Sequence, residues 1–271
     1  MSPFFSGRNY SGRSADKNLS KIISRMGYGR EIYQYYYLYR HELTNWASHI
    51  SNTRQFITDC ARRCCGRRTC IVLGSGWCLD VPVLELSRMF DTVYLVDAVH
   101  PDKVEKKASE FKNVRFVTED ITQIVAETYN SVTRYKDFCP DVLMSAPNYI
   151  NSRYSDNLGD FDFVVSVNTL PFLAGPIISY LLELELIKDD DISSRSLEEF
   201  LQQYHLKILP KGKSCVVSPV GEKKMNADGL EMYDKSIVYF PPSVVKDSKS
   251  WIWNYSSGPG RMEYNVKAWE Y

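Results

Sequence analysis

The sequence lacks the marks of several common classes of protein. Its 33 basic and 33 acidic residues leave no net charge at pH 7, which argues against a general nucleic-acid binder or a protein of membrane surfaces. No apolar run reaches the ~20 residues that a bilayer-spanning helix needs, and no charged, apolar and small-residue leader opens the chain. We therefore expect a cytoplasmic protein that has neither a membrane nor a nucleic-acid partner and keeps its thiols mostly free.

The seven cysteines show no common metal-binding spacing. Cys60, Cys64, Cys65 and Cys70 lie close together, but their spacing matches no zinc pattern and no second ligand cluster follows. The sequence therefore predicts no metal site and leaves the role of this cluster open.

What the chain does have is the composition of a packed globular protein, with 44% apolar and 24% charged residues among 271. We divide it into a mobile N-terminus (1–18), a helical lid (19–68) and an α/β domain (69–271). The lid region is broken near Gly27-Tyr-Gly29 and contains five tyrosines between positions 33 and 39. Tyr33, Tyr36 and Tyr37 recur at helical spacing, so they either pack on the domain or line a pocket.

Short, continuous apolar runs alternate with helical patterns after residue 68. Runs of this kind are typical of parallel strands that helices cover on both faces, so the fold class is doubly wound α/β. The expected strands are Cys70–Leu73, Val93–Val96, Val114–Val117, Phe161–Val167 and Lys213–Ser218. Asp80 is a plausible helix cap, Ser196–Glu199 forms a capping box that starts another helix, and His205 is expected at a helix surface or rim.

Two segments depart from this alternation. Trp251, Trp253 and Tyr255 alternate with polar residues, and a second alternating run follows Gly260, which predicts an antiparallel hairpin at the sheet edge. The irregular stretch Tyr129–Gly159 is long for a plain connection, as binding loops often are.

A glycine turn and a carboxylate form the most informative pattern. Residues 71–80 read Ile-Val-Leu-Gly-Ser-Gly-Trp-Cys-Leu-Asp, and Asp97 closes the next apolar run, 21 positions after Gly76. Glycines let a ligand approach the backbone closely, and a helix N-terminus offers free N–H groups. A carboxylate can accept two hydrogen bonds from a ribose diol. The pattern therefore predicts a nucleoside-binding site.

Two classes of cofactor use this geometry. An NAD enzyme needs a third glycine three positions after the second, where this chain has Leu79. Residues 69–271 more closely resemble class I S-adenosylmethionine-dependent methyltransferases. That resemblance implies S-adenosyl-L-methionine as cofactor and a mostly parallel seven-stranded sheet with a C-terminal antiparallel hairpin, here preceded by the helical lid.

The resemblance also implies the cofactor-binding residues, which are Gly74, Ser75, Gly76, Asp97, Asp120, Ile121 and Asn168. The first three form the loop beside the methionine part, Asp97 binds the ribose, Asp120 with Ile121 meets the adenine, and Asn168 lies by the sulfonium. Helix capping is the alternative role for both aspartates. The chain departs from the family at Val72, where an acid is usual, and at Cys78, where a third glycine is usual; Asp80 can compensate.

The favoured function is methyl transfer from S-adenosylmethionine to a small molecule. An alternative is attack on the aminocarboxypropyl arm, as in nicotianamine-synthase-like enzymes, which release methylthioadenosine. A non-catalytic S-adenosylmethionine-binding module and an NAD oxidoreductase are two further alternatives. Tyr37, His100 and Asn168 are the candidates for catalysis, and the acceptor, the base and the oligomeric state stay open.

Overall fold

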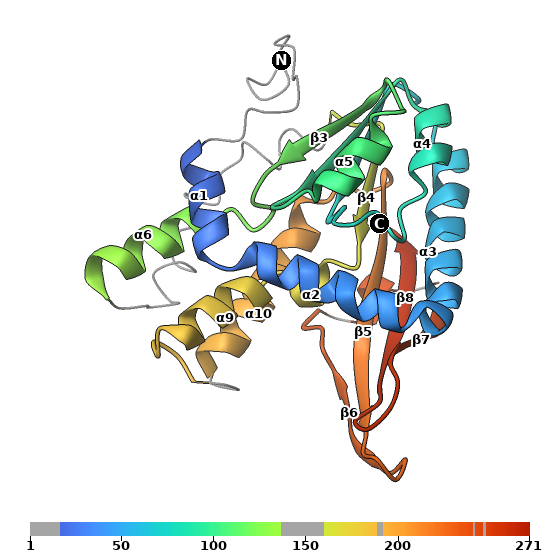
Figure 1. The fold of residues 1–271 in the computed structure, drawn as a ribbon. Helices are drawn as coiled ribbons and strands as arrows, with labels where there is room; N and C mark the ends of the chain where they lie inside the picture. The colour runs from blue at the N-terminus through green and yellow to red at the C-terminus, as the bar shows by residue number, and fades with distance from the viewer. Residues whose placement is uncertain (1–16, 137–159, 189–191, 241, 246–247) are drawn as a thin grey trace.

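A single eight-stranded sheet organises the protein (Figure 1). The computed structural model describes residues 17–136, 160–188, 192–240, 242–245 and 248–271. The strands lie in the order β3-β2-β1-β4-β5-β8-β7, and β6 pairs with the far part of β5. The parallel half consists of β1 (Thr69–Leu73), β2 (Thr92–Asp97), β3 (Val114–Thr118), β4 (Phe163–Val167) and the first part of β5 (Ser214–Met225).

Helices cover both faces of the parallel half, as the continuous apolar runs predict. Alternate residues of β1 point to opposite faces: Ile71 and Leu73 join one buried cluster, whereas Cys70 and Val72 join the other. The first cluster includes residues of α1, α6, α9 and α10, and the second includes residues of α3, α4 and α5. The doubly wound α/β class is therefore confirmed.

The N-terminal region forms three helices with different surroundings. These are α1 (Lys17–Arg25), α2 (Tyr28–His41) and α3 (Leu43–Arg63), and the chain turns between the first two at Gly27, whose φ is +81°. Helix α3 packs against the sheet through Trp46, Phe56 and Ile57, all buried, and lies along β7. Only α2 crosses the carboxyl ends of the strands. Within residues 19–68, predicted as a lid, α2 therefore lies at the cavity, whereas α3 packs as part of the α/β core.

The connecting helices begin at other residues than the sequence predicts. They are α4 (Val83–Met89), α5 (Asp102–Ala108), α6 (Val125–Tyr135), η1 (Leu170–Phe172), α9 (Gly175–Glu183) and α10 (Ile192–Ile208). Asp80 is not a cap, because α4 starts after Pro82 and has no side-chain cap. The capping box at Ser196 is also wrong, because the helix already runs from Ile192. Helix α6 takes up the start of the irregular stretch, and residues 137–159 lie outside the described residues, as do residues 1–16 of the predicted mobile N-terminus.

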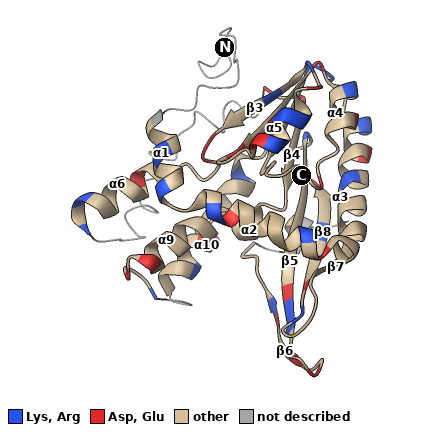
Figure 2. Cartoon of the chain, in the orientation of Figure 1, with Lys and Arg blue, Asp and Glu red and all other residues tan. Residues whose placement is uncertain are grey.

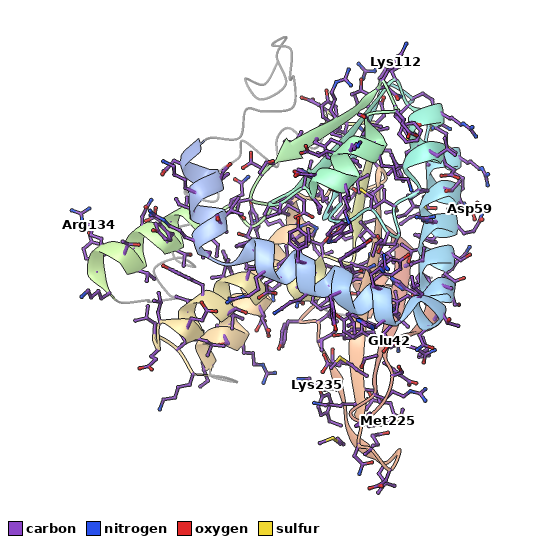
Figure 3. The ribbon with its side chains drawn as sticks, in the orientation of Figure 1. Glu42, Asp59, Lys112, Arg134, Met225 and Lys235 are labelled. Carbon is purple, nitrogen blue, oxygen red and sulfur yellow. The ribbon has the colours of Figure 1, made fainter. Side chains whose placement is uncertain are left out.

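The antiparallel half contains the predicted hairpin and one unpredicted strand. β7 (Lys249–Ser256) and β8 (Met262–Glu270) pair with each other, and β8 inserts between β5 and β7. The strand β5 continues past Ser218 to Met225 and pairs there with β6 (Glu231–Ser236), so the sheet has eight strands, not seven. This extension forms an arm below the body of the sheet, and Figure 3 shows Met225 and Lys235 on it. The short helix η2 (Pro242–Val245) follows β6.

Charge is spread over the surface. Figure 2 shows basic and acidic residues interspersed along the outer helices and the arm. None of the described helices has the length and apolar character that crossing a bilayer requires.

Candidate functional site

A cavity of about 430 Å³ opens at the carboxyl ends of the parallel strands, beneath α2. Its walls come from the glycine turn after β1, the ends of β2 and β3, the segment after β4, one face of α2, and Tyr255 of β7. Ligands bind at this edge in open α/β sheets, and the volume falls in the range of small-molecule pockets. The cavity brings together all seven residues that the resemblance assigns to the cofactor.

The turn after β1 depends on residues with positive φ. Gly74 has φ +78°, and a Cβ there would lie 2.2 Å from Thr169 Oγ1 and 3.1 Å from the Val167 carbonyl oxygen, so only glycine fits. Gly74 N donates to the Val96 carbonyl (3.0 Å), which ties the turn to β2. Cys78, at the position of the family's third glycine, holds a left-handed φ of +52° all the same and lines the cavity.

Asp97 closes β2 with its carboxylate against the glycine turn. Gly76 N donates to Oδ2 over 2.8 Å, and Val99 N lies 3.4 Å from Oδ1. Each oxygen keeps a second lone pair for a ligand hydroxyl. Burial raises the pKa of Asp97, against the opposing influence of His100 and of the backbone N–H groups. The carboxylate thus keeps acceptor capacity at the wall of the cavity.

Asp120 lies in the cavity wall, but its carboxylate already has protein partners. Oδ1 accepts from Thr122 N (2.8 Å) and Thr122 Oγ1 (2.6 Å), and Oδ2 accepts from Val125 N (2.8 Å) at the start of α6. Burial raises the pKa of this side chain as well. The capping role is therefore observed for Asp120, whereas its contact with adenine, together with that of Ile121, remains a proposal.

Of the two roles left open for Tyr33, Tyr36 and Tyr37, the structure shows packing, because their rings contact Trp77 or His41 and none of them lines the cavity. Tyr33 and Tyr37 are 56% and 68% exposed, and Tyr37, a candidate for catalysis, contacts the His41 ring instead of the cavity. The face of α2 that does line the cavity carries Tyr28, Ile32 and Tyr35, at i, i+4 and i+7. Helix α2 therefore reaches the cavity through a face other than the one that carries Tyr33 and Tyr37.

Trp77 fixes α2 to the glycine turn. Its indole Nε1 donates to the Ile32 carbonyl (2.7 Å), and its ring stacks on Tyr36 at 3.9 Å between centroids. The sequence contains this tryptophan inside the glycine turn, but no local pattern reveals that its partner lies 45 positions earlier.

His100 lies outside the cavity wall. Its Nε2 lies 3.0 Å from the Val117 carbonyl oxygen, and its ring packs edge-on against Phe116. His100 lowers the pKa of Asp97 and therefore supports that carboxylate from outside the cavity wall.

Asn168 joins a buried polar chain at the end of β4. Its Nδ2 donates to Asp80 Oδ2 and lies 3.0 Å from His49 Nε2. His49 Nδ1 accepts from Trp251 Nε1 (3.1 Å), and its ring stacks on Trp253 at 3.9 Å. Burial lowers the pKa of His49, with Asp80 opposing, so the imidazole is neutral at pH 7. Sequence reasoning missed His49 and Trp251, which are 202 positions apart.

The charged residues in the cavity wall are all acidic among the described residues. Three buried polar atoms of its lining residues have no hydrogen-bond partner among the described residues: Tyr28 OH, Ser75 Oγ and Asn168 Oδ1. Its charged lining residues are Glu31, Asp80, Asp97 and Asp120, and no described Lys, Arg or His lines it. The charged side chains of this wall therefore complement a cationic ligand.

Two other groups of chemistry-bearing residues lie elsewhere. His205 is 1% exposed, not at a surface, and contacts Ser166 Oγ (2.8 Å); burial lowers its pKa to about 4. Cys60 and Cys64 line a second cavity at the opposite edge of the sheet. No group of three or more metal-ligating side chains occurs among the described residues, and the described cysteines are free.

Comparison with known proteins gives structural likeness only. No family model and no curated protein matches the chain. A DhpI complex with SAM and HEP is 13% identical and covers 94% of this chain and 99% of its own, with a TM-score of 0.35. The N-methyltransferase NodS from Bradyrhizobium japonicum WM9, bound to S-adenosyl-L-homocysteine, is 9% identical over 83% of this chain and 87% of its own (TM-score 0.37).

An rRNA methylase from Streptococcus thermophilus is 11% identical over 82% of this chain and 96% of its own, with a TM-score of 0.35. At these values the likeness says nothing of cofactor or acceptor. The fold itself is the expected one: a doubly wound sheet that ends in a reversed hairpin, as in class I S-adenosylmethionine-dependent methyltransferases.

Proposed function

We propose that the protein is an S-adenosylmethionine-dependent methyltransferase that acts on a small molecule. The observation that carries this proposal is the combination of the Gly74–Gly76 turn, the Asp97 carboxylate and an acidic wall in one cavity. S-adenosylmethionine has a sulfonium, an ammonium and a carboxylate, hence a net charge of +1. A wall with four carboxylates and no described cation complements it.

The same charge distribution argues against a dinucleotide. The pyrophosphate of NAD is anionic and is usually held at a helix N-terminus behind a glycine-rich turn. Here Gly76 N, which faces that space, already donates to Asp97 Oδ2, and Asp80 follows the turn. A pyrophosphate would meet two carboxylates and no described basic side chain.

In this proposal each end of the cofactor has its own residues. Asp97 accepts the ribose hydroxyls, and Ile121 with Asp120 lies beside the adenine. The turn residue Ser75 and Asp80 lie along the methionine arm, and Asp80 takes the role of the acid that the family usually has where this chain has Val72. Asn168 lies by the sulfonium.

The cofactor supplies an activated methyl group, so the protein's task is to position the acceptor in line and to keep water out. Helix α2 serves the second task, because it crosses the cavity and is held on both sides. Trp77 fastens it to the glycine turn, and Glu31 accepts from Ser179 Oγ (2.9 Å) of α9. A closed cover of this kind favours a small acceptor over a polymer.

A direct test is calorimetric titration of the protein with S-adenosylhomocysteine and, separately, with NAD. We expect saturable binding of the first and none of the second; binding of NAD alone would contradict the proposal. Mass spectrometry of the products formed from S-adenosylmethionine then separates the alternatives. S-adenosylhomocysteine reports methyl transfer, methylthioadenosine reports attack on the aminocarboxypropyl arm, and binding without any product under all acceptor conditions reports a non-catalytic module.

A further inference from the structure

Helix α2 crosses the cavity, and two of its lining tyrosines identify the two ends. At Tyr28, burial and then the charges of Asp120 and Asp97 raise the pKa, so this ring lies near both carboxylates. Tyr35 follows two turns later, roughly 10 Å along the helix. Burial raises the pKa of Tyr35 most, and Tyr255 also contributes, so this ring lies near β7. In the proposed function the nucleoside lies at Asp97 and Asp120, which leaves the end at Tyr35 for the acceptor.

Three aromatic side chains line the end of the cavity at Tyr35. They are Tyr35 of α2, Phe172 of η1 and Tyr255 of β7. Phe172 is 39% exposed, and the two tyrosines are half-buried. All three side chains therefore have surface that a ligand in the cavity can contact, although they come from segments far apart in the sequence.

Two buried rings hold the three lining rings in place. Tyr35 and Tyr255 both pack on Trp46, at 4.9 and 5.4 Å between centroids. Tyr255 and Phe172 both meet Tyr264 edge-on, at 4.9 and 6.0 Å. Trp46 and Tyr264 are buried, so the lining rings belong to one packed framework. A framework that is ordered before the ligand arrives lowers the entropy cost of binding.

The lining rings form an uncharged wall. Burial raises the pKa of Tyr35 and brings that of Tyr255 to about 12, so both phenols are neutral at pH 7. Aromatic rings attract other aromatic rings beyond the effect of buried area, and they also attract cations. A cationic acceptor, however, would have to approach the positive sulfonium closely for transfer, and the two like charges would repel each other. The rings therefore favour an uncharged aromatic ligand.

We propose, on the basis of the function proposed above, that the acceptor carries an uncharged aromatic ring, which packs against Tyr35, Phe172 and Tyr255. The ring contacts orient the acceptor, so that its nucleophilic atom faces the methyl group. An anionic acceptor is disfavoured, because Glu31 lines the cavity and no described basic side chain does. Since the cavity of about 430 Å³ must also hold the cofactor, the acceptor is a small molecule of few rings.

Matched pairs of neutral probes test the proposal. The protein saturated with S-adenosylhomocysteine is titrated with benzyl alcohol against cyclohexylmethanol, and with naphthylmethanol against its decahydro counterpart, and NMR follows the binding. We expect the aromatic member of each pair to bind tighter by about threefold or more. A pocket that selects by apolar area alone would prefer the saturated member, which has more apolar surface. Choline, titrated with S-adenosylmethionine bound so that the sulfonium is present, should bind more weakly than benzyl alcohol.

Several results would overturn the aromatic-acceptor proposal. These are equal binding within the pairs, tighter binding of the saturated members, and no saturable binding of any ring compound. Tighter binding of choline than of benzyl alcohol would overturn it as well, because the rings would then serve a cation. If S-adenosylhomocysteine itself does not bind, the proposed function fails instead, so the two failures are distinguishable.

A variant isolates one lining ring. Phe172→Leu keeps an apolar side chain at a position that is 39% exposed, so we expect the fold to be retained and the aromatic preference to fall by roughly twofold or more. Phe172→Tyr keeps the ring and should keep the preference. The matched control is Tyr37→Leu, which removes an exposed ring of α2 outside the cavity wall and should also keep it. An unchanged preference in folded Phe172→Leu would overturn the proposal, because Phe172 would not contact the acceptor.

Discussion

The parallel and antiparallel halves of the sheet contribute to the cavity in different ways. The parallel half supplies backbone groups and carboxylates at strand ends, and its hydrogen bonds join the ends of neighbouring strands or residues close in sequence. Gly74 N donates to the Val96 carbonyl of the neighbouring strand, and Thr122 N donates to Asp120 two residues earlier. The antiparallel half supplies side chains held by distant helices. Trp46 Nε1 donates to the Tyr255 carbonyl (2.8 Å) across 209 positions of sequence.

This difference predicts that backbone substitutions affect one end of the cavity and that side-chain substitutions affect the other. Ser257 N and Oγ both donate to Glu42 Oε1 at 2.8 Å, which fastens the β7–β8 turn to the junction of α2 and α3. Burial opposes ionisation of Glu42, but the hydrogen bonds from Ser257 and Asn45 hold its pKa below its usual value. The end of the cavity at the glycine turn therefore depends on backbone conformation, whereas the end at Tyr255 depends on side-chain packing between segments.

The largest effect on stability should come from adding a methyl group at Gly74, in the parallel half. Gly74→Ala places a Cβ 2.2 Å from Thr169 Oγ1 at φ +78°, and should lower the free energy of unfolding by roughly 2–5 kcal/mol. Gly76→Ala is the control: its Cβ would lie 3.8 Å from Asp97 Oδ2, an ordinary van der Waals contact, so only the strain of about 1 kcal/mol applies. Urea denaturation measures both; equal losses would mean that crowding at Gly74 is relieved by movement.

Next in size is the removal of the Asp97 carboxylate, which we propose to bind the ribose. Asp97→Ala should weaken S-adenosylhomocysteine binding at least tenfold, since a hydrogen bond to a charged group contributes roughly 1.5–3 kcal/mol. Asp97→Asn keeps one acceptor oxygen and should lose less. Calorimetry gives both affinities, and unchanged binding in Asp97→Ala would reduce the residue to a support for Gly76.

A pH effect should appear at the outer edge of the parallel half. Burial, and then the charge of Asp120, raise the pKa of Glu119 to about 7. Between pH 4.5 and 7 the native state keeps a proton that the unfolded chain has released, so the free energy of unfolding falls as pH rises, by at most about 3 kcal/mol. Glu119→Gln should resemble the wild type at pH 5 and be more stable at pH 8. Parallel pH profiles for the two proteins would contradict this assignment.

The smallest effect should come from the antiparallel half. Trp251→Phe removes the donor to His49 Nδ1 and should cost about 1 kcal/mol of unfolding free energy, with no more than a threefold change in S-adenosylhomocysteine affinity. The neighbouring Ile252 is 53% exposed, so Ile252→Val should change stability by less than about 0.5 kcal/mol. A large loss of cofactor affinity in Trp251→Phe would remove the distinction between the two halves.

The sequence could predict those parts of the site that follow from one strand and its next turn. The glycine turn and Asp97 belong to this class, because parallel strands bring their carboxyl ends to one edge. The hairpin of β7 and β8 could be predicted from alternation alone. For α2 the sequence left two roles open for its tyrosines, because Tyr28 and Tyr35, which line the cavity, differ from Tyr33 and Tyr37 only in what they pack against.

The end of the cavity at Tyr255 could not be predicted in the same way. His49, Trp251 and Tyr255 meet through packing of α3 on β7, which no local pattern encodes. His205 shows the same limit in reverse: its position near a helix end suggested a rim, yet packing buries it against Ser166.

Cys78, which stands where the family usually has a third glycine, lies beside the space proposed for the cofactor. An enzyme that stores an electrophilic methyl group risks alkylating itself, and the thiolate is the most nucleophilic form that a cysteine can take. Cys78 lines the cavity, yet burial, with Asp80 and Asp97, raises its pKa to about 12. At neutral pH its sulfur therefore stays protonated and inert. In the proposed enzyme the acids that attract a cationic cofactor would also protect this thiol from methylation.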